Sequence, residues 1–179
     1  MRLTAEKKKI VKRRAVYAAV IVLVSLLQNT PGLFPAIFSA RAFLLVPAVV
    51  CVAMFEGPVA GMFFGLLAGL AWDAASVQPF ALNAVMLTAA GYAAGMLVSG
   101  IMRNNLVSAA LLSGTALAVY CLARWLVSAL AWGTSGLFAS LARFYIPSLL
   151  YTFALMPVFY IFVRAVYTGS IRNKRGEAA

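Results

Sequence analysis

The stretch Gly61-Met-Phe-Phe-Gly65-Leu-Leu-Ala-Gly69-Leu-Ala-Trp-Asp73 decides the fold of this chain, because three glycines and one acid recur at every fourth position of an apolar run. Residues four apart lie on one face of a helix, so the glycines form a groove of bare backbone that Asp73 ends. Small residues at this spacing let membrane helices approach closely. We therefore expect Gly61, Gly65 and Gly69 to pack either against another helix of the same chain or against a partner helix.

The composition around this stretch indicates an integral membrane protein. Of the 179 residues, 64% are hydrophobic, whereas a soluble domain is about half apolar. A hydrocarbon core of about 30 Å requires roughly 20 apolar residues per helix. The fold expected is therefore an all-α polytopic membrane protein, a single domain over residues 1–179 with six transmembrane helices. The predicted spans are residues 10–28, 38–55, 58–75, 82–101, 106–131 and 142–166.

The positions of the basic residues predict how the chain is oriented. Most of them lie in tails at the two ends, residues 1–14 and 167–179. Lysine and arginine are enriched on the cytoplasmic side, and an even number of spans puts both termini on one side. We therefore expect both tails to be cytoplasmic, where they would also meet anionic lipids. Nucleic acid is not an expected partner, because the basic residues flank apolar segments instead of following a groove-binding pattern. The basic residues left for the outer side are Arg41, Arg124 and Arg143.

Two acids bracket the third predicted helix. Glu56, Gly57 and Pro58 predict its start, because proline is favoured at the first helical position and a carboxylate there meets the positive end of the helix dipole. Asp73 lies near the other end, where the dipole is negative, so it needs a partner. We expect an ion pair with Arg124, which the helical rise places near the same interface. Two alternatives stay open: Asp73 caps the turn that follows it, or it belongs to a proton relay.

The sequence argues against an enzyme and against a metal site. It contains no histidine, and its two cysteines lie singly within apolar segments. Zinc and iron sites need clusters of such ligands, and a nucleophilic serine needs a base. We therefore expect no catalytic residue, no metal and no cofactor. Cys51 and Cys121 are expected to be small buried hydrophobic residues.

The centre of the chain, roughly residues 43–100, resembles the MreD family of bacterial rod shape-determining membrane proteins. Chain length, six spans and basic tails fit the resemblance as well. It implies a multi-pass protein of the bacterial inner membrane. The residues that carry it are Phe55-Glu56-Gly57-Pro58, Gly61, Gly65, Gly69-Leu70, Asp73, Pro79, Leu82-Asn83, Gly91-Tyr92 and Gly95.

The resemblance implies a non-catalytic scaffold of the cell-elongation machinery, which helps control cell shape and peptidoglycan synthesis. Its direct partner would be the bitopic protein MreC, and the complex would connect it to MreB, RodA and a class B penicillin-binding transpeptidase. The face of Gly61, Gly65 and Gly69 is then one candidate binding site for the single transmembrane helix of MreC. The family is also similar in fold to the substrate-binding subunits of energy-coupling-factor transporters, so a vitamin transporter subunit is the alternative.

Overall fold

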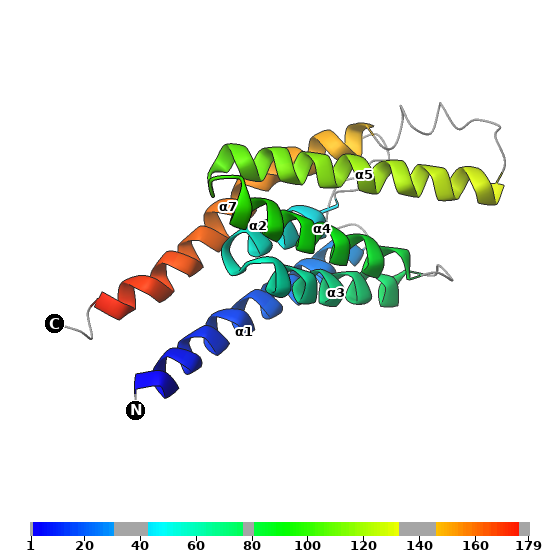
Figure 1. Ribbon diagram of the computed structural model, residues 1–179. Coiled ribbons are helices and arrows are strands. Elements are labelled where there is room, and N and C mark those ends of the chain that lie inside the picture. Colours follow the sequence, from blue (N-terminus) through cyan, green and yellow to red (C-terminus); the bar gives the residue numbers. More distant parts are fainter. Residues whose placement is uncertain (1, 31–42, 77–80, 133–145, 176–179) are drawn as a thin grey trace.

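The fold is described from a computed structural model, which covers residues 2–30, 43–76, 81–132 and 146–175. Every regular element in these ranges is an α-helix (Figure 1). The all-helical prediction is therefore confirmed for this part of the chain. In chain order the helices are α1 (Arg2–Asn29), α2 (Leu45–Glu56), α3 (Pro58–Ala75), α4 (Leu82–Gly100), α5 (Leu106–Trp132) and α7 (Ile146–Arg175).

Four helices, α3, α4, α5 and α7, are long and apolar enough to cross a membrane. Helix α2 is apolar but has 12 residues. Helix α1 has 28 residues, and its apolar part begins after a basic run that ends at Arg14. Each predicted span therefore overlaps a helix, and four of these helices have the length and composition of a span. The start of α3 at Pro58 is the predicted one.

Helix α2 lies at the centre of the bundle. Every residue from Leu45 to Met54 is buried, and the helix contacts α1, α3, α4, α5 and α7. A helix that is apolar on all sides can be buried on all sides. The surrounding helices instead expose large apolar side chains, such as Phe63 and Leu126, as expected of surfaces that face lipid. The other helices are thus arranged around α2.

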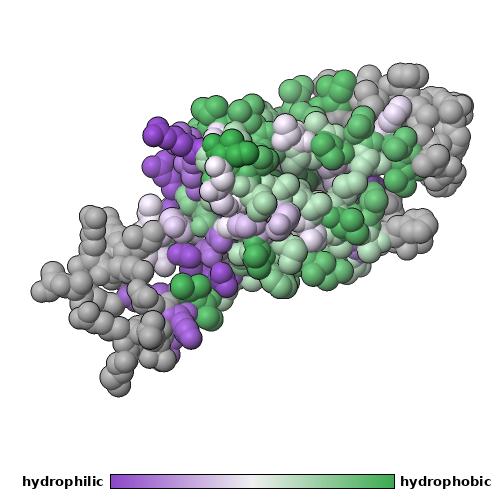
Figure 2. Space-filling model, viewed as in Figure 1, coloured by the Kyte–Doolittle hydropathy of each residue, from purple (hydrophilic) through white to green (hydrophobic). Residues whose placement is uncertain are grey.

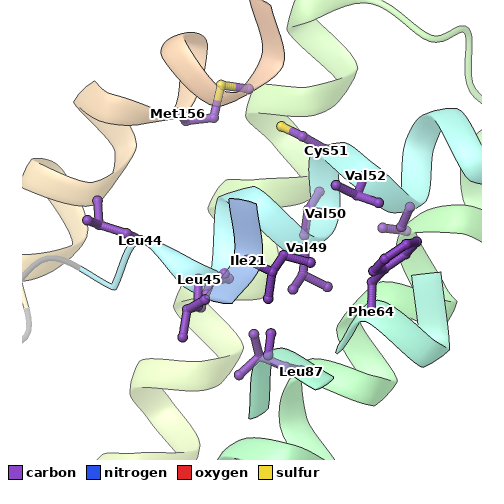
Figure 3. Packing of buried hydrophobic residues seen from close by; sticks show 14 of the residues in the cluster. Ile21, Leu44, Leu45, Val49, Val50, Cys51, Val52, Phe64, Leu87 and Met156 are labelled. Carbon is purple, nitrogen blue, oxygen red and sulfur yellow. The ribbon is translucent and has the colours of Figure 1, made fainter. Parts of the chain in front are cut away.

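Side chains from the surrounding helices close the core around α2. Figure 3 shows Ile21 of α1, Phe64 of α3 and Leu87 of α4 packed near the valines of α2. Ile21 is fully buried, so the apolar part of α1 belongs to the core. Cys51 and Cys121 are free and buried, as predicted.

The two ends of the bundle differ in polarity. The first turns of α1 and the last turns of α7 extend from the same end (Figure 1). Figure 2 shows hydrophilic residues concentrated there, while most of the remaining visible surface is apolar. We call this end, which includes Lys7–Arg14 of α1, the basic end. The opposite end, where α3 finishes at Ala75 and α4 begins at Leu82, is called the Asp73 end.

Candidate functional site

Gly61, Gly65 and Gly69 lie along one face of α3, and we call this face the glycine stripe. It lies directly against the backbone of α4. A methyl group at Gly65 would lie 2.7 Å from the carbonyl carbon of Leu87, and one at Gly69 would lie 2.6 Å from the backbone nitrogen of Ala84. A methyl group at Gly61 would meet the carbonyl oxygen of Gly91 at 2.5 Å. These distances are far below van der Waals contact, so each of these glycines is required for the close approach of the two helices.

Helix α4 supplies glycines of its own to this contact. A methyl group at Gly95 would lie 2.5 Å from the Cα atom of Pro58, at the first turn of α3. Gly91 lies opposite Gly61. The face of Gly61, Gly65 and Gly69 is thus occupied by α4 of the same chain, which is the internal one of the two packing partners considered from sequence.

Asp73 links the end of α3 to the beginning of α4. Its carboxylate accepts hydrogen bonds from the backbone N–H groups of Asn83, at 3.3 Å, and Ala84, at 2.8 Å. The first N–H groups of a helix have no partner within that helix and form its positive end. Helix α4 has no capping side chain of its own at Ala81, so Asp73 caps α4 from the neighbouring helix.

The Asp73 carboxylate thus has backbone partners in α4, and its ion pair with Arg124 stays a prediction. The backbone donors of α4 lie within reach of the carboxylate because the glycine stripe brings α4 close to α3. In the turn after Asp73, the backbone carbonyl of Asp73 accepts a hydrogen bond from the N–H group of Ser76 at 3.1 Å, and residues 77–79 of that turn lie outside the described residues.

Replacing Asp73 with alanine is expected to reduce the free energy of unfolding by about 1–2 kcal/mol, the upper range for loss of a helix cap. Asp73→Asn should cost less, because the amide retains one oxygen acceptor. Thermal unfolding of the purified variants measures both effects. Equal losses in the two variants would contradict the capping role and would indicate that the negative charge itself matters, as in the predicted pair with Arg124.

Aromatic and polar side chains extend the contact at the Asp73 end into the core. The hydroxyl of Tyr120 donates a hydrogen bond of 2.6 Å to the side-chain oxygen of Asn83. The ring of Tyr120 stacks on Trp72, with 5.3 Å between centroids, and meets Phe43 edge-on at the same separation. Asn83 is buried, so its partner Tyr120 prevents an unsatisfied polar group in the core. This cluster joins α3, α4 and α5.

The basic end is held by an ion-pair cluster around Glu56. Its carboxylate contacts Nε of Arg13 and, at 3.3 Å, Nε of Arg14. The Glu56 side chain is 2% exposed, so these arginines neutralise a buried charge. The Arg13 guanidinium also lies 4.8 Å from the ring centroid of Tyr167 in α7. Glu56 is the last residue of α2 and binds α1, whereas the sequence predicts that it opens α3.

The residues Gly57 and Pro58 form the turn between α2 and α3. Gly57 is the single residue between the two helices, and its φ of 89° lies in the region that favours glycine. Its N–H group donates to the carbonyl of Ala53 at 2.9 Å, and its carbonyl accepts from the N–H group of Gly61 at 2.9 Å. Pro58 occupies the first turn of α3 as predicted. The turn thus positions Glu56 beside α1.

An apolar groove lies between α4 and α5. It has a volume of about 260 Å³, and we call it the α4–α5 groove. Its two polar side chains are already satisfied: the Thr115 hydroxyl donates to the carbonyl of Leu112 at 3.0 Å, and Tyr120 binds Asn83. The groove therefore suits an apolar occupant. Small residues and a valine that line it are Ala89, Ala90, Ala93 and Ala94 of α4, and Ala116 and Val119 of α5.

Two of the predicted residues lie outside the part of the chain that the structure describes. Arg41 and Arg143, two of the three basic residues assigned to the outer side, lie outside the described residues. Within the described ranges, no group of three or more histidine, cysteine or acidic residues could hold a metal ion. The arrangement that the structure shows is one of helix packing, with Asp73 bound to the backbone of α4 at one end and Glu56 paired with arginines of α1 at the other.

Comparison with known proteins gives the family. Residues 10–169 match the family described as rod shape-determining protein MreD. No curated protein and no solved structure matches the chain, so the likeness to energy-coupling-factor subunits stays a prediction. The family match begins in α1 and continues into α7, and it therefore includes the glycine stripe, both acids and the α4–α5 groove. The chain belongs to the MreD family of rod shape-determining membrane proteins.

Proposed function

We propose that this chain is a non-catalytic scaffold of the bacterial inner membrane that binds MreC directly. Through MreC it would take part in the cell-elongation complex with MreB, RodA and a class B penicillin-binding transpeptidase, and so help control cell shape and peptidoglycan synthesis. Family membership supports a role in rod shape. Both basic tails would lie in the cytoplasm, because lysine and arginine are enriched on the cytoplasmic side of membrane proteins.

The observation that carries this proposal is the α4–α5 groove. The glycine stripe is already covered by α4, so it offers no open face to a partner. The α4–α5 groove is apolar and has small residues on its α4 side, among them the exposed Ala93. Small residues let a second membrane helix approach closely. We therefore place the single span of MreC in the α4–α5 groove.

The groove also favours a scaffold over a vitamin transporter subunit. A site for a water-soluble vitamin needs polar groups that converge on the ligand. The polar side chains of the groove, Thr115 and Tyr120, are already engaged in hydrogen bonds with the protein itself. Native mass spectra of the chain purified from its own membrane distinguish the two functions. A bitopic protein of the MreC type is expected; a stoichiometric vitamin-sized ligand would favour the transporter.

Replacing Ala93 with leucine is expected to reduce MreC recovery about tenfold, because the larger side chain occupies the α4–α5 groove and a misfit of this size costs about 1–3 kcal/mol. The measurement is the amount of MreC that co-purifies with the tagged chain. Ala118→Leu is the matched control, because Ala118 is exposed on α5 and does not line the groove. Equal MreC recovery with both variants would exclude the groove as the docking site.

A further inference from the structure

A second hollow lies at the basic end, between α1 and α7. It has a volume of about 250 Å³, and we call it the α1–α7 cleft. Its polar rim consists of Lys9, Lys12 and Arg13 from α1 and Ser170 from α7, and Val16 and Val166 also line it. Each valine lies about one helical turn closer to the bundle than the polar residues of its own helix. The cleft therefore has a cationic mouth and an apolar floor.

The side chains that the structure describes give this mouth a net positive charge. Arg13 and Arg14 contact Glu56, whereas Lys12 is exposed at the rim. Among the acids whose side chains are described, Glu56 and Asp73, Glu56 alone lies at the basic end. Lysine ammonium groups and the Ser170 hydroxyl are donors that suit a phosphate oxygen.

The form of the cleft restricts the kind of ligand. Its volume of about 250 Å³ is slightly below the roughly 300 Å³ at which small-molecule pockets begin. Such a space suits part of a molecule whose remainder stays outside. Gly169 keeps the α7 side open, because a methyl group there would meet no atom within 4 Å. An amphipathic ligand with a small anionic head would match both the mouth and the floor.

We propose that the α1–α7 cleft binds the headgroup phosphate of an anionic phospholipid. The phosphate would lie between Lys9, Lys12 and Ser170, and the acyl chains would follow Val16 and Val166 into the bilayer. Basic pockets between membrane helices on the cytoplasmic side bind acidic headgroups in this way. The site requires neither MreC nor the α4–α5 groove, so it goes beyond the scaffold role and is tested separately from it.

The test measures lipid binding to the full chain in detergent by native mass spectrometry, with dioleoylphosphatidylglycerol as the probe and dioleoylphosphatidylcholine as the neutral comparison. Lys9→Gln/Lys12→Gln is expected to weaken phosphatidylglycerol binding about tenfold or more, since two cations near the phosphate are lost. The matched control is Lys7→Gln/Lys8→Gln, which removes the same charge from exposed positions of α1 outside the cleft. It should change binding by only about twofold, because exposed charges outside the cleft are screened by salt.

Three results would overturn the proposal. Equal weakening by both lysine pairs would show diffuse attraction to the basic end, and equal binding of phosphatidylcholine would show that the headgroup charge is not recognised. Displacement of the lipid by inorganic phosphate at equal concentration would show a phosphate site without lipid contacts.

Ser170→Glu provides a second test from the α7 side, because it places a negative charge at the rim. It should weaken phosphatidylglycerol binding about tenfold, and unchanged binding would also exclude the site.

Discussion

Replacing Gly65 with alanine is expected to lower the melting temperature of the purified protein by about 5–10 °C. The added methyl group would lie 2.7 Å from the carbonyl carbon of Leu87 and 2.9 Å from the Cα atom of Thr88. Both are backbone atoms, so α3 and α4 must move apart and lose contact along the whole glycine stripe. Overpacking costs about 1–3 kcal/mol, and in a domain of this size each kcal/mol corresponds to about 2–4 °C.

The matched control for Gly65 is Gly169→Ala. Gly169 also lies within a helix, but a methyl group there would meet no atom within 4 Å. Alanine is favoured over glycine inside a helix by about 0.5–1 kcal/mol, so this variant should melt at the same temperature or slightly higher. Differential scanning calorimetry of both variants in the same detergent compares their melting temperatures. Identical melting temperatures for Gly65→Ala and Gly169→Ala would refute close backbone packing between α3 and α4.

Replacing Glu56 with glutamine is expected to reduce the free energy of unfolding by about 3 kcal/mol. Removing one partner of a buried ion pair costs about 3–5 kcal/mol, because the remaining charge is left without compensation. The lower end applies here, since the side chain of Arg13 is 14% exposed while that of Glu56 is 2% exposed. Denaturant titration of the purified variants measures the loss.

Two further variants separate the ion pair from general effects of substitution. Arg14→Gln should cost at most about 1 kcal/mol, because the Arg14 side chain is 53% exposed and exposed pairs contribute little. The double variant Glu56→Gln/Arg13→Gln should lose less than the sum of its two single variants, because their shared interaction is counted once. Additive losses, or a Glu56→Gln cost no larger than that of Arg14→Gln, would disprove the buried pair.

The helices were predictable because a membrane helix is encoded locally. An apolar run must be long enough to cross the bilayer, and Gly57-Pro58 marks a helix start through backbone conformation alone. Gly91 and Gly95, whose spacing matches the glycine stripe, could be identified from sequence as candidate neighbours. The central place of α2 was not foreseen. A possible signal was the run from Leu45 to Met54, which is apolar without interruption and has no aromatic residue.

The partners of the two acids could not be predicted, because each depends on which helices are neighbours. The predicted pair of Asp73 with Arg124 rests on depth in the membrane, which does not specify proximity within the plane. The backbone donors of Asn83 and Ala84 have no sequence signature at all. For Glu56 a signal existed: it precedes Gly57 on the side that the orientation rule assigns to the basic tails, where an acid meets many cations.

The single-residue turn at Gly57 has a consequence for biosynthesis. Because one residue separates the two helices, α2 and α3 can enter the bilayer together as a hairpin whose tip stays in the cytoplasm in the proposed orientation. Glu56 at that tip then never crosses the hydrocarbon. Helix α1 is synthesised earlier, so Arg13 is already present when the hairpin emerges from the ribosome. The α1–α2 ion pair can thus form before α4, α5 and α7 are made, and the central helix is secured before the rest of the bundle closes around it.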